Sequence, residues 1–210
     1  MEEKKYSTPQ EEFWAGDFGN EYINRNQSAE YLASNLNFFV KALNQAGRPQ
    51  SLIEFGANIG MNLKAIKALF PEIKLGGIEI NAEAAKELGN IIGEDNVFHG
   101  SIFDYESAEK FEVSLIKGVL IHINPDMLPL IYQKLYDASS KYILVCEYYN
   151  PSPVTINYRG HSDRLFKRDF AGEILEKYPG LKLIDYGFVY KRDPAFSQDD
   201  ITWFLMQKIG

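Results

Sequence analysis

Two glycines and two glutamates have the types and spacing to hold a nucleoside. The segment EFGANIG, residues 54–60, contains Glu54, Gly56 and Gly60, and Glu79 follows in GIEIN. Glycine lets a backbone turn tightly and approach a ligand, and an acid after the second strand accepts both hydroxyls of a ribose. The pattern therefore predicts a nucleoside-type cofactor. The alternative is that the glycines only shape a turn and that Glu79 is a solvated strand end.

The glycine loop differs from the common phosphate-binding loops. Asn58 stands where the dinucleotide pattern G-x-G-x-x-G has its central glycine, and no G-K-[ST] occurs. A pyrophosphate needs bare backbone or a lysine there, whereas a sulfonium amino acid does not. The pattern E-x-G-x-x-x-G thus counts against a dinucleotide oxidoreductase.

Two histidines are candidate catalytic bases. His122 lies just past a predicted strand at 111–118, and His161 lies in a basic segment near residue 160. Imidazole is the natural base near neutral pH. The alternative for His122 is a packing or orienting role, and His99 is expected to be structural.

The basic segment YRGHSDRLFKRDF stands out in a chain whose net charge is −7. Arg159, Arg164, Lys167 and Arg168 lie within it. Such a cluster on an acidic protein suggests an anionic substrate, and the arginines can fork onto a carboxylate or phosphate. The alternative is a solvated loop whose bases pair with neighbouring acids.

A second segment, EYYNPSP (147–153), is expected on the substrate side of the cleft through Tyr148, Tyr149 and Asn150. Its Asn-Pro pair follows the fifth predicted strand. The Asn-Pro-Pro-aromatic motif of adenine and glutamine N-methyltransferases follows the fourth strand, so neither activity is assigned. The alternative is a plain turn after a strand.

The segment FWAGDFGNEYINRN (13–26) precedes every predicted strand and mixes aromatic with small residues. We expect it to cover the cleft, with Trp14, Phe18 and Tyr22 as walls and Arg25 on the carboxylate of the cofactor. The alternative is a packing segment in front of the first long helix.

Alternating apolar segments predict the elements that position these residues. Strands are expected at 51–55, 74–80, 96–100, 111–118 and 141–149, and a helix at 27–46 has Leu32, Leu36, Phe39, Val40 and Leu43 on one face. Further helices follow the first, second and fourth strands, with Asn81 and Asn124 as caps. Strands at 181–193 and 201–209 form an antiparallel pair. The pattern predicts an α/β, doubly wound, mostly parallel sheet of seven strands with helices on both faces.

Composition fits one domain and excludes several classes of protein. The 210 residues are 45% hydrophobic, with a single cysteine, Cys146, and no apolar run near the length of a membrane helix. We expect a cytoplasmic protein, monomeric or homodimeric, without a metal site and without nucleic-acid or membrane partners. Residues 1–46 are expected to form an N-terminal cover and helical segment, and residues 51–210 the catalytic core.

The glycine loop and the acid resemble those of class I S-adenosylmethionine-dependent methyltransferases. In that family the loop holds the amino-acid end of the cofactor and the acid holds the ribose. HGSIFDY (99–105) resembles the segment that lines the adenine, with Ser101 in place of the usual acid, and IKGVLIHINPDML (116–128) resembles the fourth-strand segment. The resemblance implies the strand order 3-2-1-4-5-7-6, S-adenosyl-L-methionine as cofactor and S-adenosyl-L-homocysteine as product. The further cofactor contacts that it implies are Ile80, Ser101, Ile102, Lys117 and Gly118.

Three edge segments, 13–26, 159–170 and 199–205, look like the methylases that accompany pseudaminic acid biosynthesis genes in bacteria. This second resemblance covers nearly the whole chain. It implies a small anionic substrate of the sugar-acid or nucleotide-sugar type. A methyltransferase acting on a protein side chain or terminus, and a non-catalytic binding module, remain alternatives.

Overall fold

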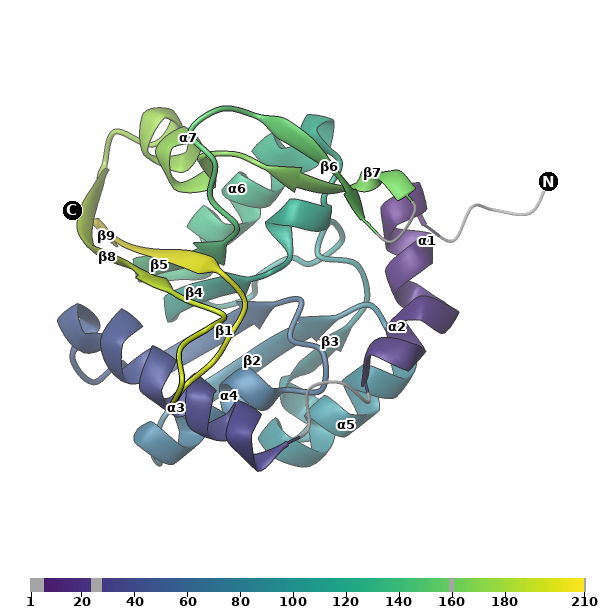
Figure 1. The fold of residues 1–210 in the computed structure, drawn as a ribbon. Coiled ribbons are helices and arrows are strands. Elements are labelled where there is room, and N and C mark those ends of the chain that lie inside the picture. The colour runs from purple at the N-terminus through teal and green to yellow at the C-terminus, as the bar shows by residue number, and fades with distance from the viewer. Residues whose placement is uncertain (1–5, 24–27, 159–160, 210) are drawn as a thin grey trace.

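The structure, a computed structural model, describes residues 6–23, 28–158 and 161–209; side chains at positions 22, 157, 158 and 161–164 are outside this description. A seven-stranded sheet with the order β3-β2-β1-β4-β5-β9-β8 forms its centre (Figure 1). The strands are β1 (Ser51–Phe55), β2 (Lys74–Glu79), β3 (Val97–His99), β4 (Phe111–Lys117), β5 (Ser139–Glu147), β8 (Leu181–Val189) and β9 (Ile201–Lys208). β9 runs antiparallel to both neighbours, and the other pairings are parallel. The predicted fold class and strand order are therefore confirmed.

Helices cover both faces of this sheet (Figure 1). One hydrophobic core joins the sheet to α3 (Ala29–Ala42), α4 (Met61–Leu69) and α5 (Ala82–Ile92), through side chains such as Phe39, Leu63 and Leu88. The other core joins it to α6 (Leu128–Ala138) and α7 (Phe170–Lys177), through Ile131 and Ile174. Both cores are continuous because parallel strands bury both faces.

The long helix before β1 is shorter than predicted and is rotated relative to the expected stripe. Ser28 caps α3 by accepting a hydrogen bond from the backbone N–H of Tyr31 at 3.1 Å. Phe38 and Phe39 are buried, whereas Val40 is 55% exposed. The expectation that Val40 faces the core is wrong, because a side chain 100° around the helix from Phe39 lies outside the buried stripe.

The basic segment is not a plain loop. β6 (Val154–Tyr158) and β7 (His161–Lys167) form a separate antiparallel pair, in which Ile156 lies opposite Leu165. Leu165 is buried, while Ile156 is partly exposed at 38%. The expected loop is corrected to a strand pair, in which Leu165 is packed into the core of the protein.

Two short helices precede α3 and lie at the edge of the sheet where β3 ends (Figure 1). They are α1 (Pro9–Ala15) and α2 (Asp17–Ile23), together called the N-terminal cover below. Thr8 caps α1 by accepting from the backbone N–H of Glu11, and the Glu11 side chain accepts from the backbone N–H of Thr8 in return. This reciprocal capping box fixes where the cover begins.

Candidate active site

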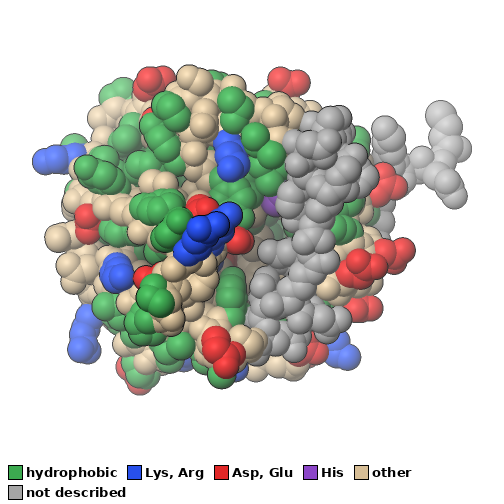
Figure 2. Space-filling model, in the orientation of Figure 1, with side chains coloured by type: hydrophobic (Ala, Val, Ile, Leu, Met, Phe, Trp, Pro, Cys, Tyr) green, Lys and Arg blue, Asp and Glu red, His purple; other side chains and the backbone are tan. Residues whose placement is uncertain are grey.

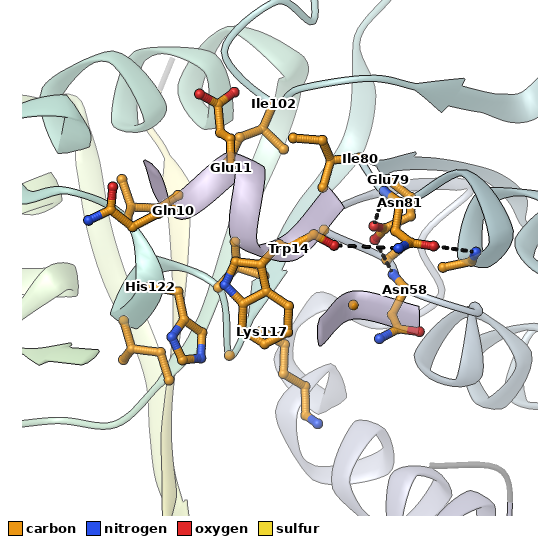
Figure 3. A pocket seen from close by; sticks show the side chains of 18 of the residues that line it. Gln10, Glu11, Trp14, Asn58, Glu79, Ile80, Asn81, Ile102, Lys117 and His122 are labelled. Atoms are coloured by element: carbon orange, nitrogen blue, oxygen red, sulfur yellow. Dashed lines mark hydrogen bonds between the residues drawn. The ribbon is translucent and has the colours of Figure 1, made fainter. Parts of the chain in front are cut away.

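A cavity of about 480 Å³ lies at the carboxyl edge of the parallel strands, which is where ligands bind in open α/β sheets. Segments that follow β1, β2, β3, β4 and β5 line it, together with α1. In the space-filling view this face of the molecule is hollowed near its middle (Figure 2). The lining side chains that matter most below are drawn in Figure 3.

The loop after β1 depends on left-handed backbone. Gly56, Asn58 and Gly60 have φ angles of 75°, 49° and 80°. A Cβ on Gly56 would lie 2.6 Å from Cγ2 of Val119, so a larger residue does not fit there. Asparagine tolerates the left-handed region better than most residues, and the backbone N–H of Asn58 donates to Oε2 of Glu79 at 2.7 Å. Asn58 thus replaces a glycine without losing the turn.

Glu79 is buried at the cavity, with 8% of its surface exposed. Besides Asn58, the backbone N–H of Asn81 donates to its Oε1 at 2.8 Å. Burial raises the pKa of Glu79, and the backbone N–H donors act in the opposite direction. The alternative of a solvated strand end is therefore wrong. A carboxylate has about four lone-pair positions, so Glu79 can still accept a ligand hydroxyl beside these backbone donors.

Glu54 lies beneath the cavity and is fully buried. Its Oε1 accepts from Nδ2 of Asn62 at 2.6 Å, while Oε2 has no hydrogen-bond partner among the described residues. Burial raises the pKa of Glu54 to about 8, opposed by the amide of Asn62 and the charge of Lys117. Asn62 and Lys117 both line the cavity, so these two side chains stand between a ligand in the cavity and the buried Glu54.

The far end of the cavity, beyond β3, is mostly apolar and contains one acid that the sequence analysis missed. Ile80, Ile102 and Phe103 line it, and Ser101 lies beside them. The Ser101 hydroxyl donates to Oε1 of Glu11 and accepts from the backbone N–H of Phe103 at 3.1 Å. Glu11 comes from α1, so this contact joins the N-terminal cover to the core.

Some aromatic residues of the N-terminal cover pack against one another, and one of them lines the cavity. Phe13 stacks on Phe18 with ring centroids 4.1 Å apart, whereas Trp14 lies against the ring of His122 at 4.8 Å and lines the cavity (Figure 3). Asn81 anchors the cover, because its Nδ2 donates to Oδ1 of Asn20 at 2.6 Å. Its Oδ1 caps α5 by accepting from the backbone N–H of Ala84 at 3.0 Å, as predicted.

The described structure is similar to solved structures of methyltransferases. Mitomycin 7-O-methyltransferase MmcR matches with a TM-score of 0.68 and 16% identity over 96% of this chain, which spans 61% of that protein. 1,6-Didemethyltoxoflavin-N1-methyltransferase from Burkholderia thailandensis was solved with bound 1,6-didemethyltoxoflavin and S-adenosylhomocysteine. It matches with a TM-score of 0.68 and 14% identity over 99% of this chain and 93% of that one. Magnesium protoporphyrin IX methyltransferase from Synechocystis PCC 6803, solved with bound SAM, matches with a TM-score of 0.67 and 9% identity. The match covers 96% of this chain and 98% of that one. This is the class I methyltransferase fold.

Sequence comparison adds nothing to this assignment of the methyltransferase fold. No family model matches the chain, and no curated protein is significantly similar to it. The resemblance to methylases associated with pseudaminic acid biosynthesis is supported by neither of these comparisons nor by the structural matches. It stays a prediction.

The structure brings together most of the predicted residues whose side chains it describes. The predicted residues that line the cavity are Trp14, Gly56, Asn58, Glu79, Ile80, Ser101, Ile102, Lys117, Gly118, His122 and Tyr148. Those that do not line it are Phe18, Glu54, Gly60, Tyr149, Asn150 and Arg168. Arg25 and Arg159, and the side chains of Tyr22, His161 and Arg164, lie outside the described part of the chain.

The predicted residues that do not line the cavity are engaged elsewhere. Nε of Arg168 pairs with Oε1 of Glu173 at 3.0 Å. Tyr149 is 43% exposed and lies beside the ring of Phe204. The side chain of Asn150 donates to the carbonyl oxygen of Ser152, in the manner of a turn residue.

Two acids of the lining were missed by the sequence analysis. Glu11 could have been found, because Thr8-Pro-Gln-Glu11 has the form of a capping box, which marks a helix start. Asp199 lines the cavity because the loop before β9 folds back on α3, where Nε2 of Gln198 donates to Oδ1 of Asn35 at 2.8 Å. No local pattern predicts a contact between residues so distant in sequence.

No helix in residues 6–23, 28–158 and 161–209 has the length and apolar character to cross a membrane. Within the same ranges, no three His, Cys, Asp or Glu side chains gather in a way that could hold a metal ion.

Proposed function

We propose that this protein is an S-adenosylmethionine-dependent methyltransferase that acts on a small polar, anionic metabolite of the sugar-acid or nucleotide-sugar type. The observation that carries the proposal is Glu79, a buried carboxylate fixed by backbone N–H groups beside a left-handed glycine loop, at the ligand edge of a methyltransferase fold. Similar structures have been solved with S-adenosylhomocysteine or SAM bound.

The residues present fit this cofactor. Glu79 offers acceptors for the ribose hydroxyls, the loop from Gly56 to Gly60 is open to the amino-acid end, and Ile80 and Ile102 offer apolar contacts to a purine. The bound cofactor supplies an electrophilic methyl group on a sulfonium, and the protein supplies position.

Two residues of the chain have a role in the reacting part of the cavity. His122 is 8% exposed and faces the cavity, so it can take a proton from a hydroxyl or amine acceptor. Trp14 lies against its ring and restricts both the orientation of the imidazole and the access of water. His161 is the second candidate base that we propose.

The β6–β7 pair supports an anionic substrate. Leu165 of β7 lines the cavity, and Nζ of Lys167 lies 5.0 Å from the ring centroid of Tyr148, which also lines it. Lys167 of this strand pair therefore lies beside a residue of the cavity wall. We propose Arg159 and Arg164 as the substrate anchors rather than Arg168, because Glu173 already pairs with Arg168.

A methyl-transfer assay tests this proposal. The protein is incubated with trideuteromethyl S-adenosylmethionine and either a bacterial extract of anionic metabolites or a peptide library, and products are read by mass spectrometry. We expect the deuterium label in an anionic metabolite and none in peptides. Label in peptides alone would favour a protein substrate, and bound cofactor without any labelled product would favour a binding module.

The matched control for this assay is Glu79→Gln. The substitution keeps the size of the side chain but places an amide N–H toward the backbone N–H of Asn58 or Asn81. Because a charge-assisted hydrogen bond contributes about 1.5–3 kcal/mol, we expect cofactor affinity to fall by at least about tenfold. Labelled product that forms equally with this variant would contradict the proposed site.

A further inference from the structure

At the far end of the cavity, an acid from α1 lies beside a serine. Ser101 stands at the position where the resembling family usually has an acid, and Glu11 of α1 contacts it (Figure 3 shows Glu11 beside Ile102). We propose that Glu11 selects the cofactor by accepting a hydrogen bond from the exocyclic amino group of a 6-aminopurine, and that Ser101 positions it. This inference rests on the proposed function and deepens it.

The location of Glu11 is suited to a purine. Glu79 marks the ribose site at the end of β2, and the next segment outward, after β3, brings Ile102 and Phe103 to the cavity. Ile80 lies between the two. A mostly apolar lining with a few buried polar groups is the usual arrangement for a small-molecule ligand. Glu11 is 7% exposed and lines this end.

The hydrogen bonds of Ser101 and Glu11 leave a free acceptor position on Glu11, and the one hydroxyl proton of Ser101 is already donated. The single proton of the Ser101 hydroxyl is donated to Oε1 of Glu11, and the backbone N–H of Phe103 occupies one of its lone pairs. Oε1 of Glu11 accepts this one hydrogen bond and has room for a second, since a carboxylate oxygen accepts two. An amino group of a purine can be the second donor, whereas a carbonyl oxygen at the same position would face an acceptor.

The carboxylate of Glu11 is already oriented for this role. Oε2 accepts from the backbone N–H of Thr8 at 2.8 Å and from its hydroxyl at 3.2 Å, while the backbone N–H of Glu11 donates to that hydroxyl at 3.2 Å. Its two oxygens therefore have separate tasks. Oε2 closes the capping box of α1, and Oε1 accepts from Ser101. Cofactor recognition and the docking of the N-terminal cover thus share one side chain.

The test compares two ligands whose bases differ at position 6 of the purine and, as a consequence, in the proton on N1. S-adenosylhomocysteine has an amino group at position 6 of the purine, and its deaminated analogue, S-inosylhomocysteine, has a carbonyl oxygen there. A site built to accept from an amino group discriminates strongly against an analogue that lacks it. We expect the wild-type protein to bind S-adenosylhomocysteine at least about tenfold more tightly in calorimetry.

Glu11→Gln is the decisive variant. Glutamine also serves at this position of a capping box, and its amide can donate to the carbonyl of the inosine analogue. We expect the ratio of the two dissociation constants to fall by at least about fivefold, through weaker binding of S-adenosylhomocysteine and tighter binding of the analogue. Glu12→Gln is the matched control on the same helix, because Glu12 is exposed, and it should keep the wild-type ratio.

Ser101→Ala provides a second readout that leaves the capping box intact. Loss of its hydroxyl removes the donor that positions Oε1, so the ratio should fall in this variant as well. A wild-type ratio in both Glu11→Gln and Ser101→Ala would overturn the role of Glu11. If the wild-type protein binds neither ligand, the proposed function fails, and that result is distinct from binding without discrimination.

Discussion

Glu147→Gln tests how the structure positions the segment that carries His122. Glu147 is the last residue of β5 and is 3% exposed. Its Oε1 accepts from the backbone N–H groups of Val119 and Leu120, both at 2.9 Å. Its Oε2 is buried and has no hydrogen-bond partner among the described residues. The chain after β4 is therefore held by one buried acid.

The contribution of Glu147 to the pH dependence of the unfolding free energy follows from the pKa of its carboxyl group. Burial raises the pKa of Glu147 to about 7, although the backbone N–H groups of Leu120, Val119 and Ile121 and the charge of Lys117 act in the opposite direction. The unfolded chain releases the proton at the ordinary value of 4.5, so between these two pH values the folded state binds more protons. Stability is greatest below the unfolded pKa and falls as the pH rises through the folded pKa, and the loss from this residue is about 3 kcal/mol.

Urea unfolding of the ligand-free protein measures this loss at about pH 4 and about pH 8, on either side of both pKa values. Glutamine keeps the acceptor for Val119 and Leu120 and does not ionise. We expect equal stability of variant and wild type at the lower pH, and a variant more stable by about 3 kcal/mol at the higher pH. Other buried acids, Glu54 among them, cancel in the difference. A variant that is no more stable than the wild type at the higher pH would refute this reasoning.

Three further substitutions test separate parts of the site. Gly56→Ala places a Cβ 2.6 Å from Val119 at a φ of 75°, so thermal unfolding should show a loss of about 1–3 kcal/mol, and an unchanged melting temperature would contradict the close approach. Asn81→Asp keeps the cap of α5 but has no N–H for Asn20; chymotrypsin should cut the N-terminal cover several-fold faster, and unchanged cleavage would show that this contact does not hold it. His122→Asn should lower turnover by about a hundredfold or more while the dissociation constant of S-adenosylhomocysteine holds, and unchanged turnover would remove the histidine as base.

Sequence patterns predicted the parts of the fold that depend on local periodicity. Strand and helix alternation predicted a doubly wound, mostly parallel sheet of seven strands from the positions of the apolar segments, whereas the order of the strands followed from the resemblance to class I methyltransferases. The glycine loop and Glu79 were found for the same reason, since both positions are fixed relative to the ends of β1 and β2. Asn81 was recognised as a helix cap from its place in front of α5.

The remaining parts depend on contacts that no local pattern contains. Glu11 meets Ser101 across ninety positions of sequence, and Gln198 meets Asn35 across an even longer separation. The β6–β7 pair was hidden by its charges, which suggested a loop, although Val154 and Ile156 alternate as in a strand. The orphaned oxygen of Glu54 is likewise a consequence of burial and not of sequence spacing.

Calorimetry with S-adenosylhomocysteine and with NAD tests the central claim most directly. The backbone-held carboxylate of Glu79, the glycine loop without its central glycine and the cavity of about 480 Å³ together predict micromolar binding of S-adenosylhomocysteine. They predict no binding of NAD at the same protein concentration. Binding of NAD without S-adenosylhomocysteine, or binding of neither, would contradict the account.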